Sequence, residues 1–332
     1  SVEYIAEVGY GSMFQKFCAP HQAGSGDGTT CWTDIQISPT VVNLYEVVAN
    51  DNTVKPFNWE DFFPQWNSLP IEDRKVFFIR DKTFQGTEVH STITKAIDDQ
   101  INGLGENAKS LYLPTGNEER IIKAYENRDP RLNYSVIVPY SKFRGVEKNR
   151  TYEYDYIFRW PVTGKHFANE IDAENNLREG MLPSLAANAQ AKCMYMFRKF
   201  VGVGLEYKYR TDNPVDEPII RYADVLLMWA EALVELNDLP GAKAKVEQVR
   251  NRVKMPTMAS SFADQETARK YVRDERRREL IGEGVNFFDE MRWRTLKETK
   301  FDNNNSQMVW GGNAGGSYQW IGDQWYTWPV PK

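Results

Sequence analysis

The stretch from Pro218 to Trp293 decides the fold, and it begins PIIRYADVLLMWAEALVELN at residues 218–237. Apolar residues recur in it every three or four positions, a spacing that places them on one face of a helix. The residues on this face are Ile219, Ala223, Leu226, Ala230 and Leu233. Ile220, Leu227 and Val234 widen the face, so we expect this helix to be covered on more than one side.

A second helix follows after a break at Asn237-Asp238. Pro240 begins it at a first-turn position, where the missing backbone N–H costs least. The sequence GAKAKVEQVRNRV at 241–253 then places four small or branched apolar residues on a single stripe, namely Ala242, Val246, Val249 and Val253. This pattern predicts a second helix with one apolar face.

Two more helices are predicted before Trp293. The segment TARKYVRDERRRELIGEG at 267–284 ends at Gly282 and Gly284, residues suited to a left-handed C-terminal cap. The segment NFFDEMRWRTL at 286–296 begins at Asn286, a favourable N-cap residue, and pairs Phe287 with Met291. Helix pairs joined by short turns are typical of tetratricopeptide-like units of about 34 residues.

A free-standing helical solenoid normally needs at least about three such units, and this stretch supplies about two. We therefore expect the helices to pack on the rest of this chain or on a segment outside it. The predicted fold is mainly α, a tetratricopeptide-like scaffold at 218–300. A loop-rich subdomain with short helices and short β-strands at 1–217 would present the ligand, and residues 301–332 would form a C-terminal loop and a short strand.

Inside the loop-rich part, helices are predicted at Thr40–Ala49 and Glu118–Tyr125. Residues 51–115 indicate mainly loops with short strands, because Asn, Asp, Gly and aromatic residues interrupt any periodicity. The segments YSVIVPYS at 134–141 and YEYDYIFRW at 152–160 favour strands.

Segments of this chain resemble the SusD/RagB-like nutrient-binding outer-membrane lipoproteins. The strongest resemblance lies in RYADVLLMWAEAL, VRNRV and DERRRELIGEGVNFFDEMRW, which match the C-terminal half of that family. Other matching pieces occur in the order that the family uses: PTVVNLYEVV, FNWEDFFPQWNSL, AYENRDPRL, VIVPYSKFRG, YIFRWP, MFRKFVG and YTWPVPK. The resemblance is spread over nearly the whole chain, and it rests on the set of segments together.

The resemblance implies a non-catalytic protein that is lipid-anchored on the outer face of a Gram-negative outer membrane. It also implies a SusC-like TonB-dependent transporter as partner and an oligosaccharide as ligand, with a peptide or another nutrient as the alternative. Members carry a signal peptide, a lipid-modified cysteine and further N-terminal helices. The start SVEYIAEVGYGSMF lacks signal-peptide features, so we expect this sequence to be a processed or truncated part of a longer protein.

Composition excludes several classes of function. The chain has 46 acidic and 41 basic residues, and its net charge of −5 argues against a nucleic-acid partner. No stretch approaches the roughly 18 apolar residues that a membrane span requires. Membrane attachment would therefore depend on an N-terminal lipid outside this sequence.

The sequence contains no motif for catalysis, a cofactor or a metal. Its histidines, His21, His90 and His166, lack metal-ligand spacing, and GSGDG at 24–28 matches neither a phosphate loop nor a calcium loop. We therefore predict no enzyme, no cofactor and no metal ligands, although a calcium ion that shapes a loop stays open. Cys18 and Cys31 could form a disulfide or remain small apolar residues, and both alternatives stay open.

Aromatic residues make up 13% of the chain, and many lie in segments without periodicity. In a sugar site an aromatic plane stacks on C–H groups, while amides or carboxylates orient the hydroxyls. This pattern predicts ligand contacts from Trp32, Asp34, Trp66, Asn67 and Tyr112, with loop anchoring as the competing interpretation. Trp59, by contrast, is predicted to lie in the core among Phe57, Phe62 and Phe63.

Charged residues at 274–279, the sequence DERRRE, are predicted to have a structural role. Asp274 with Arg278, and Glu275 with Arg278 or Glu279, are helix neighbours, and the arginines and glutamates could also bridge adjacent helices. In RDPR at 128–131, we expect the charges of Asp129 and Arg131 to clamp a turn.

Two further functions remain as alternatives. A tetratricopeptide-like scaffold that binds only a protein partner would show a large apolar concave surface. A glycoside hydrolase would place two carboxylates roughly 5–10 Å apart across a cleft.

Overall fold

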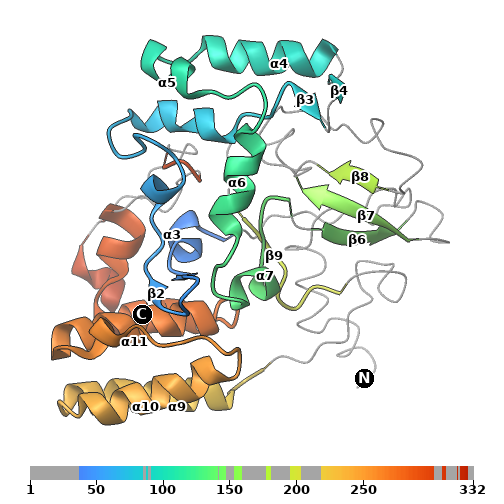
Figure 1. The fold of residues 1–332 in the computed structure, drawn as a ribbon. Helices are drawn as coiled ribbons and strands as arrows, with labels where there is room; N and C mark the ends of the chain where they lie inside the picture. Colours follow the sequence, from blue (N-terminus) through green and yellow to red (C-terminus); the bar gives the residue numbers. More distant parts are fainter. Residues whose placement is uncertain are drawn as a thin grey trace, which may run out of the picture.

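The computed structural model describes residues 37–84, 87–88, 91–140, 142–146, 153–158, 177–180, 195–202, 218–302, 309–311, 320 and 322–327. Helices dominate this part of the chain, as predicted. In Figure 1, helices α4 (Ser91–Asn102) and α5 (Glu106–Leu111) lie at one end of the molecule. The helical block lies at the other end, and α6 (Asn117–Tyr125) connects the two regions.

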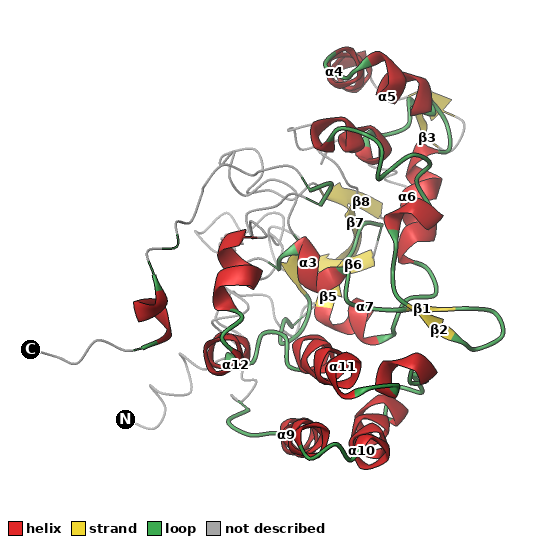
Figure 2. Cartoon of the chain, turned by 90° about the vertical axis from the view of Figure 1, so that its left-hand side faces the viewer, coloured by secondary structure: helices red, strands yellow, loops and turns green. Residues whose placement is uncertain are grey.

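The helical block consists of α9 (Tyr222–Glu235), α10 (Leu239–Asn251), α11 (Gln265–Glu279) and α12 (Val285–Trp293), with a 3-10 turn η5 (Ala259–Phe262) before α11. All four helices were predicted. Figure 2 shows α9 and α10 side by side, and α11 lies alongside them and packs mainly on α9. Together these three helices bury one apolar cluster, to which each contributes: Leu226, Leu227, Ala230, Val234, Ala242, Val246, Val249, Ala268, Tyr271 and Val272.

Helix α10 begins as its sequence predicts. Pro240 lies in its first turn, and the Asp238 carboxylate accepts a hydrogen bond from the Gly241 N–H at 2.9 Å, which caps the helix. Gly282 and Gly284 adopt positive φ angles of 79° and 77°, the left-handed conformation for which glycine is suited. Neither caps α11 as predicted, because this helix ends at Glu279 with Leu280 as its C-cap.

Two predicted helix starts are wrong. Helix α9 begins at Tyr222, and Ile219, expected on its buried face, precedes the helix and is 88% exposed, as is most of Ile220. Helix α12 begins at Val285 with Gly284 as its N-cap, so Asn286 is not the cap. The Asn286 amide instead donates to Glu290 one turn later, at 3.2 Å.

The loop-rich part contains short helices and strands, which are too short to give a clear periodic pattern in the sequence. Its remaining helices are α3 (Pro39–Val42), α7 (Arg131–Ser135) and the 3-10 segments η1 (Trp59–Asp61) and η2 (Ile71–Phe78). Its strands form antiparallel pairs β1–β2 (Val47–Val48, Val54–Lys55), β3–β4 (Thr83–Phe84, Thr87–Glu88) and β5–β9 (Val136–Ile137, Met196–Phe197). A three-stranded sheet pairs β6 (Lys142–Val146) antiparallel to β7 (Glu153–Phe158) and β7 parallel to β8 (Leu177–Gly180).

Several expectations for this region need correction. The helix predicted at Thr40–Ala49 is only four residues long, because the chain turns at Asn43 and enters β1. Residues 51–115 were predicted as loops, yet they contain the twelve-residue helix α4. The strand predicted at 134–141 is limited to Val136–Ile137, whereas the helix predicted at Glu118–Tyr125 is confirmed, with its start at Asn117.

The C-terminal region contains a π-helical turn η6 (Lys297–Asp302) and a 3-10 turn η7 (Asp323–Tyr326). The predicted terminal strand lies mostly outside the described residues. Val309 and Trp310 belong to the main hydrophobic cluster of the loop-rich part, so this region contributes to the core.

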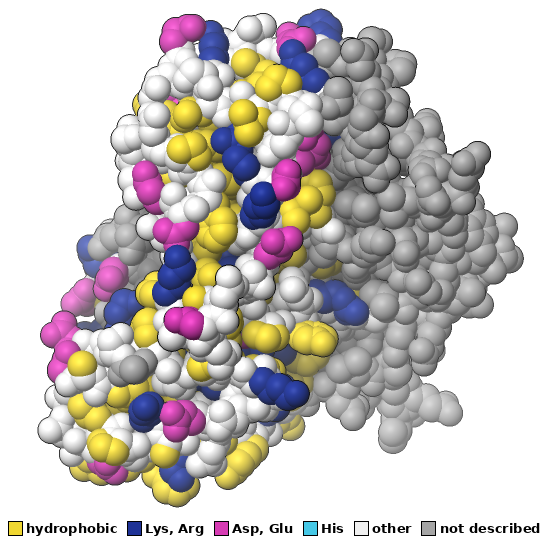
Figure 3. Space-filling model, viewed as in Figure 1, with side chains coloured by type: hydrophobic (Ala, Val, Ile, Leu, Met, Phe, Trp, Pro, Cys, Tyr) yellow, Lys and Arg dark blue, Asp and Glu magenta, His cyan; other side chains and the backbone are white. Residues whose placement is uncertain are grey.

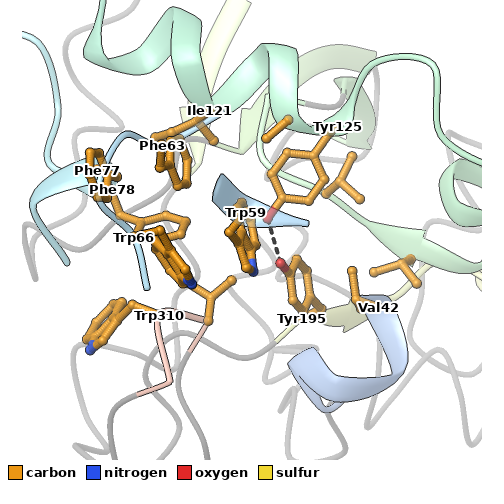
Figure 4. Close-up of a cluster of buried hydrophobic side chains, with 14 of the residues drawn as sticks. Val42, Trp59, Phe63, Trp66, Phe77, Phe78, Ile121, Tyr125, Tyr195 and Trp310 are labelled. Carbon is orange, nitrogen blue, oxygen red and sulfur yellow. Dashed lines mark hydrogen bonds between the residues drawn. The ribbon is translucent and has the colours of Figure 1, made fainter. Parts of the chain in front are cut away.

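An aromatic cluster forms the centre of that main core (Figure 4). Phe63 is fully buried and stacks on Phe77, with ring centroids 4.7 Å apart and planes within 3°. Trp59 stacks on both Phe63 and Trp66, at 5.1 Å and 5.2 Å, which confirms its predicted core role. Such rings anchor segments that have little regular structure of their own.

The described residues carry surface charges of both signs. On the face drawn in Figure 3, acidic and basic side chains of the described residues are interspersed. Within the described part of the chain, no helix is long and apolar enough to cross a bilayer. The same part holds no group of three or more histidine, cysteine or acidic side chains arranged for a metal ion.

Candidate ligand-binding site

The site is built around a buried ion-pair network on α11. Glu275 is fully buried, and its carboxylate accepts hydrogen bonds from Arg131 at 2.6 Å, Arg250 at 2.8 Å and Arg278 at 2.8 Å. These partners come from α7, α10 and α11, so one carboxylate joins the loop-rich part to the helical block. Burying these charges costs free energy, and the hydrogen-bonded pairing offsets that cost.

The predicted structural role of the charge cluster is therefore confirmed, with one change in pairing. Glu275 pairs with Arg278 as expected, whereas Asp274 pairs with Lys270 at 2.6 Å and Arg277 at 3.4 Å rather than with Arg278. Arg278 is instead directed toward the chain after α3 and donates to the carbonyl oxygen of Leu44 at 2.9 Å.

The RDPR segment forms the clamp that the sequence predicts. Arg131 donates from Nε and Nη2 to the two carboxylate oxygens of Asp129, at 3.0 Å and 2.6 Å. Its Nη1 continues to Glu275 and to Glu279 at 3.1 Å. The turn is thus fixed locally and tied to α11 at the same time.

The network shifts the pKa of its central carboxyl. Burial alone would raise the pKa of Glu275, but the nearby guanidinium groups of Arg131, Arg278 and Arg250 outweigh burial and hold this pKa well below the usual range. In the unfolded chain the same carboxyl titrates near 4.5. The folded state therefore keeps Glu275 ionised at pH values where the unfolded state takes up a proton.

This difference predicts a loss of stability in acid. The contribution of Glu275 is fully present above pH 4.5 and decreases as the pH falls from there toward the depressed folded-state pKa, because the unfolded state then binds more protons. We expect urea denaturation at pH 6, 4.5 and 3.5 to give a falling free energy of unfolding. The change should be smaller in Glu275→Gln, and an identical change in both proteins would contradict this assignment.

A cavity of about 290 Å³ opens beside this network. Its walls come from α7, the turn after β9, the N-terminus of α9, the end of α10 and α11. In Figure 2, α7 lies next to α11, the two helices that Arg131 and Glu275 connect. The lining residues are Arg131, Tyr134, Ser135, Lys199, Arg221, Arg252, Val253, Arg278 and Glu279.

The cavity combines an exposed ring with free hydrogen-bond donors. Tyr134 is 76% exposed. The side chain of Arg252 is 56% exposed, and its Nη2 donates to both carboxylate oxygens of Glu279, at 2.8 Å and 2.9 Å. Its Nε and Nη1 have no hydrogen-bond partner among the described residues, so they can donate to a ligand.

Paired charged side chains lie next to Tyr134 and Arg252 and form one wall of the cavity. Arg221 donates to Glu283 at 2.7 Å and to Glu279 at 3.0 Å, and Lys199 pairs with Glu283. Burial lowers the pKa of Lys199, although the carboxylate of Glu283 opposes this shift. Because Glu279 accepts from Arg131, Arg221 and Arg252, its oxygens are occupied and the cavity mainly offers donors. Such a site suits a ligand rich in hydroxyl or carbonyl oxygens.

The residues predicted to contact ligand are not gathered at this cavity. Trp32 and Asp34 lie outside the described residues. Trp66 is 5% exposed, stacks on Trp59 and carries the Arg74 guanidinium 5.1 Å from its ring centre, so it has a packing role instead. Asn67 is exposed, and its backbone N–H donates to Glu60 at 2.8 Å.

Tyr112 also has a packing role. Its ring is 9% exposed, and its hydroxyl donates to the carbonyl oxygen of Arg80 at 2.8 Å. Burial raises the pKa of this phenol, which stays neutral. For Trp66 and Tyr112 the competing interpretation, that these rings anchor loops to the core, agrees with their contacts.

Tyr134, Arg221 and Arg252 line the cavity but were not among the predicted ligand contacts. Tyr134 lies three residues after the RDPR segment, and Arg252 lies inside the segment 241–253, next to Val253 of its apolar stripe. The exposure of these side chains depends on how α7 packs against α11, and no local pattern in the sequence predicts that packing. The sequence signal was the position of Tyr134 three residues after the clamp residue Arg131.

The fold and the site together form a helical scaffold with an open cavity whose lining offers mainly hydrogen-bond donors. The SusD family model matches residues 1–332, and the chain belongs to this family, which confirms the resemblance drawn from its segments. Members of the family are nutrient-binding proteins rather than enzymes, associate with the outer membrane and work with SusC-like transporters.

Among solved structures, a SusD-like protein from Bacteroides fragilis NCTC 9343 is similar to this chain, with 18% sequence identity and a TM-score of 0.47. The match covers 86% of this chain and 41% of that protein, so the chain spans less than half of its length. No curated protein matches the sequence.

Proposed function

We propose that this protein is a non-catalytic, cell-surface binder that captures nutrient oligosaccharides through the cavity beside Tyr134. It would pass them to a SusC-like TonB-dependent transporter in a Gram-negative outer membrane. The observation that carries the proposal is the match to the SusD family along residues 1–332. The exposed ring and the hydrogen-bond donors of the cavity also support the proposal.

The exposed groups of the cavity suit a sugar ring. The open face of Tyr134 can stack on C–H groups, and the free N–H groups of Arg252 can donate to ring or hydroxyl oxygens. An open site of this kind gives modest affinity and fast release, which a protein that passes its ligand to a transporter requires.

A compact ligand fits this cavity better than an extended peptide. Peptides bound through their main chain use an unpaired strand edge or a long groove. The described walls of the Tyr134 cavity are helices and turns, and its volume is about 290 Å³. Peptides remain the competing ligand class.

The carboxylates of the cavity argue against hydrolysis. Glycoside hydrolysis needs one carboxyl that gives up a proton and a second that acts as base or nucleophile. Among the described residues that line the cavity, Glu279 is the one carboxylate, and its oxygens accept hydrogen bonds from Arg131, Arg221 and Arg252. The described lining therefore offers no pair of carboxyl groups for this chemistry.

The test is a calorimetric titration of the protein with a panel of neutral and acidic oligosaccharides and of peptides. We expect at least one glycan to bind and to be recovered uncleaved. Tyr134→Ala should weaken that binding by about threefold to tenfold, the usual contribution of one aromatic stack. Phe288→Ala is the matched control, because this ring is 60% exposed on α12 and is not among the residues that line the cavity.

Three results would contradict the proposal. They are binding of peptides without any glycan, cleavage of a bound glycan, and an equal affinity in Tyr134→Ala and the unmodified protein.

A further inference from the structure

The Tyr134 cavity belongs to an ion-pair network whose charges do not balance. Within the described part of the chain, direct ion pairs connect six cationic side chains to five carboxylates. The cations are Arg131, Lys199, Arg221, Arg250, Arg252 and Arg278. The carboxylates are those of Glu46, Asp129, Glu275, Glu279 and Glu283. The network therefore has a surplus of positive charge, although the whole chain has a net charge of −5.

The surplus charge faces the cavity rather than the protein interior. The side chain of every carboxylate in this network is at most 4% exposed. Three cations of the cavity lining are more open, since the side chains of Lys199, Arg221 and Arg252 are 18%, 29% and 56% exposed. A solute that enters the cavity therefore meets the cationic side of these ion pairs.

Arg252 is the most exposed and the least compensated of the three. Among the described residues its one carboxylate partner is Glu279, which also pairs with Arg131 and Arg221. Arg221 has a second carboxylate partner, Glu283, at 2.7 Å. Nε and Nη1 of Arg252, and Nη1 of Arg221, donate no hydrogen bond within the described part of the structure, so they remain available to a ligand.

The guanidinium groups of Arg221 and Arg252 lie close together. Their Nη2 atoms both donate to Oε1 of Glu279, at 3.0 Å and 2.8 Å. The two positive charges repel each other, and the single charge of Glu279 is divided between them and Arg131. An anion beside them relieves this repulsion, and its hydrogen bonds with a guanidinium are stronger than those of a neutral hydroxyl.

The cavity has room for one sugar residue that carries an acidic group. A volume of about 150 Å³ accommodates benzene, and this cavity has about 290 Å³. The exposed ring of Tyr134 offers a stacking surface, and Arg252 belongs to the same lining. An acidic sugar therefore finds a partner for its C–H face and another for its charge.

We propose that the Tyr134 cavity selects acidic glycans, with a carboxylate or a sulfate ester of one sugar residue bound at Arg252 beside Arg221. The bound acid compensates the surplus charge of the network while Tyr134 stacks on the sugar ring. This inference rests on the proposed function, glycan binding at the Tyr134 cavity, and adds the charge of the ligand to it.

The test is calorimetric titration of the protein with oligosaccharides in matched acidic and neutral forms. Oligomers of galacturonate, mannuronate and hyaluronan are each compared with their methyl esters, and carrageenan oligomers with their desulfated forms. We expect at least one acidic form to bind about tenfold more tightly than its neutral form, and this preference should decrease between about 50 mM and 300 mM salt. The carboxylated and sulfated arms identify which acidic group is bound.

Arg252→Gln tests the assigned cation. We expect it to weaken binding of the acidic form about fivefold to twentyfold and to change binding of the neutral form less than about twofold. Arg252→Lys should retain part of the preference, because it keeps the charge. The matched control is Arg269→Gln, since Arg269 also pairs with a single carboxylate, Glu235, but is not part of the cavity lining.

Two patterns of results would overturn this inference while leaving the proposed function intact. One is equal affinity for the acidic and neutral forms of every glycan that binds. The other is a preference for the acidic form that stays the same in Arg252→Gln. A complete absence of glycan binding would instead reject both the inference and the proposed function.

Discussion

Glu275→Gln is expected to lower the free energy of unfolding by about 3–5 kcal/mol, the usual cost of removing one partner from a buried ion pair. The substitution keeps the shape of the side chain and removes only its charge. Arg131, Arg250 and Arg278 would then share a buried space without their common counter-ion. Because these arginines come from α7, α10 and α11, the loss should weaken the contact between the two parts of the molecule.

The measurement is urea denaturation at neutral pH, followed by circular dichroism. The control is Glu235→Gln, because this glutamate also pairs with an arginine, Arg269 at 2.6 Å, but its side chain is 49% exposed. Solvent screens such a pair, so we expect the control to lose less than about 1 kcal/mol. Equal losses in the two variants would show that Glu275 does not organise the junction.

Phe63→Ala is expected to cost about 3–5 kcal/mol, the range for truncating a buried aromatic residue. Phe63 has no exposed surface and contacts Trp59, Trp66, Phe77 and Phe78 through its ring. The truncation would leave a cavity at the centre of the stack, and the surrounding rings are too rigid to fill it completely.

Denaturation followed by tryptophan fluorescence measures this effect directly, since Trp59 and Trp66 border the site. Phe288→Ala is the matched control, because this ring is 60% exposed on α12 and its loss should change stability little. A small effect of Phe63→Ala, similar to the control, would mean that the aromatic cluster is not the main core of the loop-rich part.

The helical block could be predicted because the spacing of its apolar residues indicates which side chains are buried. In α9 and α10 the apolar positions repeat every three or four residues, and most of them are buried in the structure, while Ala223 and Leu233 are partly buried. The ends were less predictable. Ile219 fits the period but lies before Arg221, whose side chain pairs with Glu283 and whose backbone caps the helix.

Helix α4 was missed although its sequence carries a signal. Ile93, Ile97 and Ile101 recur every four residues, but threonines and aspartates between them resemble a loop composition. Ile97 is fully buried, and Ile101 packs against the same main core. In this segment the spacing of the isoleucines indicates the helix correctly, whereas the amino-acid composition led to the wrong prediction of a loop.

The residues that line the cavity could not be predicted in the same way. In an irregular segment the sequence shows that a ring is present but not which way it faces, so Trp66 and Tyr112 looked as available as Tyr134. Exposure of Tyr134 arises because Arg131, three residues earlier, is held by Glu275, which lies 144 positions away in the chain. The pairing of distant charges, and not a local motif, decides where the ring lies.

The most direct test of the account is a crystal structure of the protein with the oligosaccharide that binds it most tightly. The account predicts one sugar ring against the face of Tyr134, within about 4 Å as expected for stacked groups, with an oxygen accepting a hydrogen bond from Arg252. A glycan bound elsewhere on the molecule, with Tyr134 and Arg252 free of contact, would contradict it.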